Sequence, residues 1–252
     1  MSKRDQYYQT LLTLPEWDEY LCRESGLPGP RGNLELMQAV ADAGDARRFE
    51  RYAAIGPQQA STNSPQGFLA MCGVVGLGRL AAEGDHTHLA QLRRLAADPR
   101  WRIREAVAMA LQRLGAADMP ALLAEMAAWV EGGWLEQRAV VAGLCEPALL
   151  GDPAQVEQVL ALLDRITAGL AQATERKSED FIALRKGLAY GWSVAVVAHP
   201  AAGKACLERW LASTDKDVRW IVRENLKKDR LRRMDAAWVE QCQARWAQAN
   251  IS

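Results

Sequence analysis

An internal repeat constrains this chain more than any other sequence feature. Shifting the sequence by 34 positions aligns Arg104 with Arg138 and lays REAVAMAL over RAVVAGLC, with the apolar positions matched. The same shift aligns Arg185 with Arg219. A unit of this length holds a pair of short helices, and stacked units bury a continuous apolar core between them. The repeat therefore favours a chain built from helical layers.

Residues 98–114 show the helical pattern most clearly. Ile103, Ala106 and Val107 begin an apolar stripe that recurs at helical spacing as far as residue 114. Asp98 can cap the helix, and the following proline fits the first helical position because no amide donor is needed there. This predicts a helix over residues 99–114, and no alternating strand pattern competes anywhere in the chain.

The same cap-plus-proline start occurs at Ser64, Asp152 and His199. From residue 65 onward, we expect helices at 65–82, 85–97, 99–114, 119–131, 134–145, 153–172, 180–198, 200–212, 216–228 and 235–248. Two short helices broken at Pro15 and two more near 34–40 and 46–55 are expected before that. The step from Arg138 to Arg185 is 13 residues longer than the repeat, so the polar residues 173–180 are the candidate flexible insert.

Composition narrows the function classes only slightly. Charged residues make up 25% of the chain and the formal net charge is zero, so the overall balance favours neither a nucleic acid nor a membrane partner. The five cysteines are widely spaced and have no zinc-site pattern, which is typical of reduced core thiols. No apolar run is long enough for a membrane span. We expect a cytoplasmic protein with no cofactor, no bound metal and no membrane contact.

Residues 98–115 resemble the second helix of a HEAT repeat, with the Asp-Pro turn, an early arginine and an Ala/Leu stripe. Residues 214–228 resemble the same unit, and residues 134–144 match it more loosely. The resemblance implies an α-solenoid, a superhelix of paired helices over residues 65–252, with residues 1–64 as a divergent helical region packed on it. It also implies that the second helices line a concave surface.

Three places are similar to one branch of this architecture, the HEAT-like alkylpurine DNA glycosylases. Trp101 and Glu105 stand four residues apart, Arg138 lies in the sequence QRA, and Tyr190 or Trp192 offers a later aromatic ring. The resemblance implies that Glu105 stabilises a cationic sugar, that the aromatic rings pack against deoxyribose, and that Arg138 holds a phosphate. Glu105 is one methylene longer than the aspartate of that family.

A structural role competes with this interpretation. Repeated arginines and aspartates of HEAT-like layers can bond between neighbouring layers as a ladder, which Arg138 would join. The remaining members of the expected ladder are Asp98, Arg104, Arg185, Asp215 and Arg219.

Basic residues are concentrated near the C-terminus, where residues 204–233 hold ten Lys/Arg against five Asp/Glu. Lys227 and Lys228 belong to the densest part, which is either a phosphate-binding patch or the solvated end of a helix. Trp134 lies near a helix start, where an exposed groove is expected. His86 and His88 have no third ligand nearby and read as a helix cap, although a weaker hypothesis places a hydrolase or lyase site there.

We therefore expect a non-enzymatic scaffold that presents a concave helical surface, most simply to a protein partner. DNA binding of the alkylpurine-glycosylase type is the alternative. The residues expected to bind are Trp101, Trp134, Arg138, Tyr190, Trp192, Lys227 and Lys228, and Glu105 is the candidate catalytic residue in the alternative.

Overall fold

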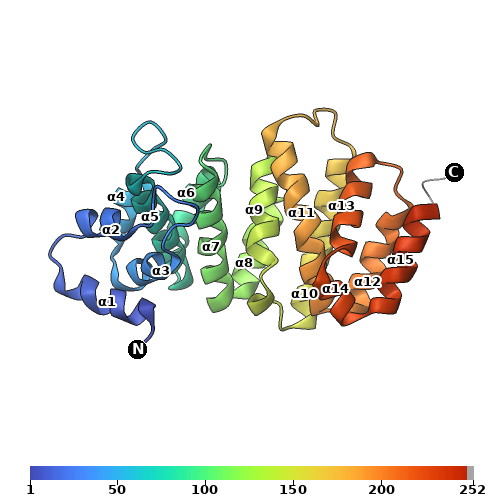
Figure 1. The fold of residues 1–252 in the computed structure, drawn as a ribbon, viewed down its shortest axis with the longest axis horizontal. Coiled ribbons are helices and arrows are strands. Elements are labelled where there is room, and N and C mark those ends of the chain that lie inside the picture. Colours follow the sequence, from blue (N-terminus) through green and yellow to red (C-terminus); the bar gives the residue numbers. More distant parts are fainter. Residues whose placement is uncertain (249–252) are drawn as a thin grey trace. The chain divides into compact units, whose positions relative to one another are not determined.

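The computed structural model describes residues 1–248, and every regular element in that range is an α-helix or a short 3-10 helix (Figure 1). The predicted all-α class is confirmed. The chain divides into two compact units, one over Met1–Asp118 and one from Met119 onward.

The first unit is organised around helix α5. Its elements are α1 (Lys3–Thr13), α2 (Asp18–Glu24), α3 (Leu34–Ala43), α4 (Ala46–Ala53), α5 (Pro65–Ala82), η1 (His86–His88), α6 (Leu89–Leu95) and α7 (Trp101–Ala117). Helices α2, α3, α4 and α7 all pack on α5, which is buried along most of its length.

Glycines on α5 allow this close packing. A Cβ atom on Gly76 would lie 2.1 Å from Phe49 Cδ1, and one on Gly78 would lie 2.3 Å from Ala110 Cα. Both distances are far shorter than a carbon–carbon contact. The boundary expected near residue 64 therefore falls inside the first unit, because α3 and α4 share their core with α5 and α7.

The second unit is organised around helix α11. Its elements are α8 (Met119–Trp129), α9 (Trp134–Leu144), η2 (Pro147–Leu149), α10 (Pro153–Ala171), α11 (Glu179–Ala198), α12 (Pro200–Arg209), η3 (Trp210–Ala212), α13 (Lys216–Leu226), α14 (Asp229–Met234) and α15 (Ala236–Gln248). Helix α11 contacts α9 and α13, and it also packs on α10 and α12.

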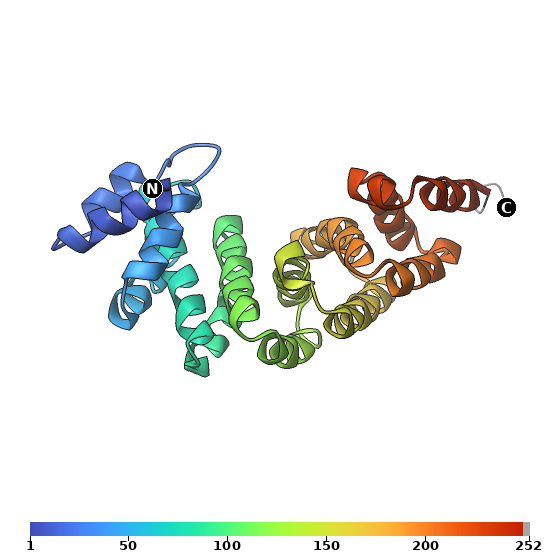
Figure 2. The same ribbon diagram turned by 90° about the horizontal axis from the view of Figure 1, so that it is seen from below.

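Helices α9, α11 and α13 run parallel. Arg138 of α9 lies beside Gly187, and Cys145 lies beside Gly191, one turn further along α11. On the α13 side, Asn225 Oδ1 accepts from the Ser193 amide, and Asn225 Nδ2 donates to a carbonyl of α11. Figure 2 shows α9 and α11 in one row of this unit and α8 and α10 in the other.

Most expected helices are present, with three informative differences. Helix α7 begins at Trp101 rather than at residue 99, because Asp98 does not cap it: the Asp98 carboxylate accepts from the Arg100 amide and guanidinium. Helix α14 was not expected. Residues 173–180, the candidate flexible insert, make hydrogen bonds to the preceding helix end: the Arg176 guanidinium donates to the carbonyls of Ala171 and Ala173.

By length and mean hydropathy alone, α11 could cross a membrane, contrary to the expectation that no segment could. More than half of its apolar window is buried within the second unit, as in the core helix of a soluble protein. Trp192 and Phe181 belong to that buried part.

Candidate macromolecule-binding surface

Tyr190 is one of the two most exposed aromatic side chains of residues 1–248, with 47% of its surface accessible. Two cations lie against it. The Arg230 guanidinium carbon is 4.4 Å from the ring centroid, and Arg230 Nη2 donates to the Tyr190 hydroxyl over 2.6 Å. Lys228 Nζ lies 5.8 Å from the same centroid. The ring and its two cations are therefore open to an anionic partner.

The turn between α13 and α14 positions these cations. Helix α13 ends at Leu226, and Lys228 occupies the extended residue immediately before α14. Leu231 is fully buried and anchors the short α14 helix, which packs on α11. Neither Lys228 nor Arg230 has a carboxylate partner among the described residues, so their charge is not neutralised locally.

Arg138 and Lys186 extend the charged surface away from this turn. The Arg138 side chain passes over Gly187, where a Cβ atom would sit 3.6 Å from Arg138 Cγ. Gly187 is one helical turn before Tyr190, and Lys186 is exposed four residues before it, on the same face of α11. We call Arg138, Lys186, Tyr190, Lys228 and Arg230 the α11 surface.

The chain matches no family model, no curated protein and no solved structure.

A hollow of about 610 Å³ lies at the N-terminal ends of α11 and α13. It is lined by Thr174, Glu175, Arg176, Lys177, Arg185, Lys216, Asp217 and Trp220. Arg185 stacks on the Trp220 ring, with 4.5 Å between the guanidinium carbon and the ring centroid. Lys177 and Lys216 are exposed at its rim, and no other described residue forms an ion pair with either of them. Besides the α11 surface, the second unit therefore has a hollow that contains further cations and the Trp220 ring.

The Asp217 carboxylate holds this hollow together. It is 4% exposed and accepts from Arg185 Nη1 at 2.5 Å and Arg176 Nη1 at 3.0 Å. Burial alone would raise the Asp217 pKa, but the hydrogen bonds from the two arginines outweigh burial and lower the pKa below its usual value. The carboxylate therefore stays ionised near neutral pH, and it links α13 to α11 and to the segment before α11.

Trp101 and Glu105 form a separate exposed pair in the first unit. Trp101 is 48% exposed at the start of α7, and Glu105 is exposed one turn later on the same face. The Arg102 guanidinium carbon lies 4.4 Å from the Trp101 ring centroid. An aromatic ring and a carboxylate are thus both accessible on this helix.

Three residues expected to bind a partner lie elsewhere. Trp192 is fully buried and donates its indole N–H to Thr167 Oγ1 over 3.0 Å, so it belongs to the core. Trp134 packs edge-on against Phe181, with the ring centroids 5.7 Å apart. Lys227 pairs with Glu224 at 2.7 Å. Of the two aromatic candidates on α11, the structure exposes Tyr190.

The residues of the expected ladder make an ion pair between neighbouring helices and several other contacts. Arg185 crosses from α11 to α13, but it binds Asp217, whereas Asp215 pairs with Arg176. Arg104 donates to the carbonyls of Asp98 and Pro99 at the start of its own helix. In addition, the Arg219 guanidinium carbon lies 5.5 Å from the Trp246 ring centroid. The Asp98 carboxylate is occupied by Arg100, both side chains being buried.

Sequence reasoning overlooked Arg230 and Lys186 as individual binding residues. Arg230 lay within the basic segment near the C-terminus, but the sequence did not show which of its cations would face Tyr190. The histidines do not converge: His88 Nε2 lies 3.4 Å from Asp85 Oδ2, and His199 Nε2 lies 3.5 Å from Glu157 Oε1. Among residues 1–248, no group of three His, Cys, Asp or Glu side chains could hold a metal ion.

Proposed function

We propose that this chain is a non-enzymatic binding protein built from HEAT-like helical layers, and that its second unit binds a macromolecular partner through the α11 surface. The parallel row of α9, α11 and α13, with α10 and α12 packed against α11, supports a solenoid-type arrangement of this unit. Such folds present extended surfaces rather than closed pockets.

The partner that this surface favours is a nucleic acid. The observation that carries the proposal is Tyr190, an accessible ring with Lys228 and Arg230 close to it. Bases stack on aromatic rings, while lysine and arginine bind backbone phosphates. The zero net charge of the chain does not oppose this, because attraction depends on the local field of the surface.

Fluorescence anisotropy with labelled single-stranded and duplex DNA, over a series of salt concentrations, tests the proposal. We expect binding that weakens steeply with salt, because phosphate contacts release counterions. Arg230→Ala and Lys228→Ala should each weaken binding and reduce the salt slope by about 1. Arg232→Ala is the matched control, since Arg232 is an exposed arginine of the same helix without a contact to Tyr190.

Two outcomes would count against the proposal. Absence of binding to either DNA at low salt would exclude a nucleic acid partner and return the α11 surface to protein partners. An equal loss with Arg232→Ala and Arg230→Ala would show that only the general charge of α14 matters, and not the surface around Tyr190.

A second candidate function, excision of alkylated purines, is supported by the exposed Trp101 and Glu105 pair. A carboxylate can stabilise the cationic sugar that forms as a base departs. Incubation with methylated duplex DNA, followed by measurement of released purine, tests it. Release that disappears in Glu105→Gln, with unchanged thermal unfolding, would support catalysis. No release by the unaltered protein would remove this candidate.

A further inference from the structure

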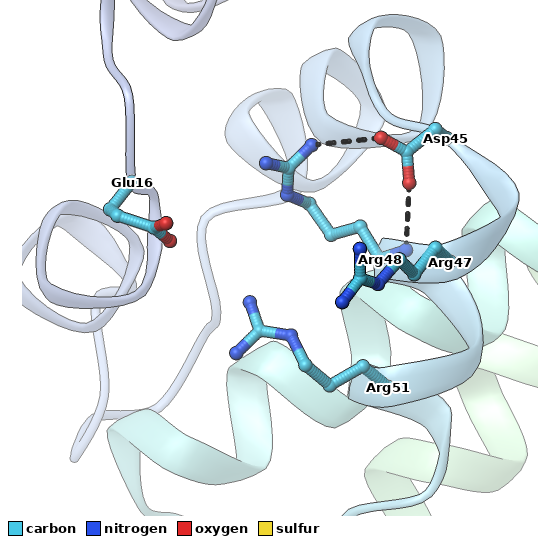
Figure 3. A pocket seen from close by; sticks show the side chains of 5 residues that line it. All are labelled: Glu16, Asp45, Arg47, Arg48 and Arg51. Carbon is cyan, nitrogen blue, oxygen red and sulfur yellow. Dashed lines mark hydrogen bonds and ion pairs between the residues drawn. The ribbon is translucent and has the colours of Figure 1, made fainter.

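A second charged feature lies in the first unit, remote in sequence from the α11 surface. A hollow of about 360 Å³ separates helix α4 from the turn that precedes α2 (Figure 3). Its lining consists of charged side chains only: Glu16, Asp45, Arg47, Arg48 and Arg51. The volume is in the range of pockets that hold small molecules.

Three arginines of α4 reach this hollow from neighbouring positions of one helix. Arg51 is held by Asp18 through two hydrogen bonds of 2.8 Å. Arg48 lies with its guanidinium carbon 3.8 Å from the centroid of the buried Trp17 ring and forms a long ion pair, 3.5 Å, with Asp45. Arg47 is exposed and forms no hydrogen bond or ion pair with any described residue.

The hollow therefore holds more hydrogen-bond donors than acceptors. Each guanidinium carries five N–H donors in a planar fork. Two of the Arg51 donors bind Asp18, whereas Arg47 has no acceptor from the part of the chain that the structure describes. Because Trp17 fixes one face of the Arg48 guanidinium, its N–H edge is held in place beside the hollow. A group with several anionic oxygens would satisfy these donors.

Glu16 faces the arginines from the opposite side of the hollow (Figure 3). It forms no hydrogen bond within residues 1–248, and its charge acts on the hollow from the side of the α1–α2 turn. An ion with only negative charge would be repelled by it. A ligand that fits both sides carries an anionic group toward α4 and a cationic group toward Glu16.

We propose that this hollow binds a small phosphate monoester that carries an ammonium group, with the phosphate on Arg47 and Arg48 and the ammonium on Glu16. A phosphate monoester supplies nearly two negative charges and three acceptor oxygens, which matches adjacent guanidinium forks better than a single carboxylate does. Arg51 remains bound to Asp18, so the phosphate contacts come from Arg47 and Arg48.

Calorimetric titration of the full chain with O-phosphoethanolamine tests the proposal, with inorganic phosphate titrated in parallel. We expect phosphoethanolamine to bind more tightly than phosphate. Arg47→Ala should weaken phosphoethanolamine binding at least about tenfold, because a charge-assisted pair of hydrogen bonds is lost. Arg31→Ala is the matched control, since Arg31 is exposed in the same unit and does not line the hollow.

Glu16→Gln separates the two ends of the site. We expect it to remove the preference for phosphoethanolamine while inorganic phosphate binds at least as well as before. Equal affinity of the unaltered protein for the two ligands would overturn the role of Glu16. No binding of phosphoethanolamine, or binding lost in Arg230→Ala but not in Arg47→Ala, would overturn the site itself.

Sedimentation with vesicles distinguishes a free monoester from a lipid headgroup. The proposal expects vesicles of phosphatidylethanolamine not to carry the protein down, because that headgroup is a diester with one oxygen fewer to accept from Arg47. Sedimentation with these vesicles that disappears in Arg47→Ala would overturn the monoester in favour of the headgroup.

Discussion

Trp101 and Tyr190 are the two most exposed aromatic side chains of the described residues, and each has an arginine against its ring, but the two arginines differ in their other contacts. Arg102, beside Trp101, is buried and donates to the carbonyls of Gly29 and Pro30. Arg230, beside Tyr190, donates to the tyrosine hydroxyl.

An aromatic–cation pair therefore does not by itself mark a binding site. In the first unit, Arg102 holds a loop in place, because its guanidinium donates to the carbonyls of Gly29 and Pro30. In the second unit, Arg230 and Lys228 have no carboxylate partner among residues 1–248, so they retain the capacity to bind phosphate.

The largest loss of stability is expected when a buried cation that pairs within the fold is removed. Arg100→Ala should destabilise the first unit by about 3–5 kcal/mol, because it leaves the buried Asp98 carboxylate without its partner. Denaturant unfolding measures the change. Arg230→Ala should alter the free energy of unfolding by no more than about 0.5 kcal/mol. Similar losses in the two variants would break the distinction between structural and binding cations.

A smaller loss is expected at the carboxylate that joins α11 to α13. Asp217→Asn should cost about 1–3 kcal/mol, because Arg185 and Arg176 lose a charged acceptor. The folded-state pKa of Asp217 is lowered, so its contribution is fully present above the unfolded pKa of about 3.9 and is lost as the pH falls through the lower folded value. Unfolding measured against pH should show a weaker acid dependence in the variant.

Tyr190→Ala tests the role of the exposed ring through binding rather than stability. Loss of the ring should weaken single-stranded DNA binding by about 1–3 kcal/mol, the range for removal of one stacking platform. Tyr190→Phe should retain most of the affinity, because the ring remains beside the two cations. Trp101→Ala should have the smaller effect on affinity in the same anisotropy assay. The reverse order would transfer the binding role to the first unit.

The smallest effect is expected at the glycine beside Arg138. Gly187→Ala should stabilise the protein by about 0.5–1 kcal/mol, since alanine favours a helix and its Cβ would meet only ordinary contacts. Gly191→Ala is the matched contrast: its Cβ would lie 2.6 Å from Val141 Cγ1, and destabilisation is expected. Thermal unfolding of both variants tests whether α9 and α11 are packed as closely as described.

The sequence predicted where the helices lie better than it predicted which side chains of each helix are exposed. Ser64, Asp152 and His199 precede prolines and do start α5, α10 and α12, because local backbone chemistry fixes such starts. Asp98 precedes a proline as well, but its carboxylate accepts hydrogen bonds from Arg100, and α7 begins two residues later than expected. The Asp-Pro pattern alone does not show that Arg100, two residues on, takes the carboxylate while its guanidinium also donates to the distant Ala60 carbonyl.

The candidate site shows the same limit. Tyr190 and Trp192 are two residues apart, so they project from different faces of α11, and the packing of neighbouring helices decides which one is buried. Trp192 is accepted into the core because Thr167 of α10 provides an acceptor for its indole N–H. Arg230 reaches Tyr190 from the first turn of α14, a helix that the apolar pattern did not reveal.

The close contact between Gly78 and Ala110 bears on the exposed pair of the first unit. Helix α7 rests directly against the α5 backbone there, near the middle of α7, and the N-terminal part of the same helix carries Trp101 and Glu105. A methyl group at position 78 would collide with Ala110 and push α7 away from α5. Because α7 is one continuous helix, Trp101 and Glu105 would move with it, although neither touches the glycine. Substitutions at this distant position would therefore alter whatever Trp101 and Glu105 do, without changing either residue.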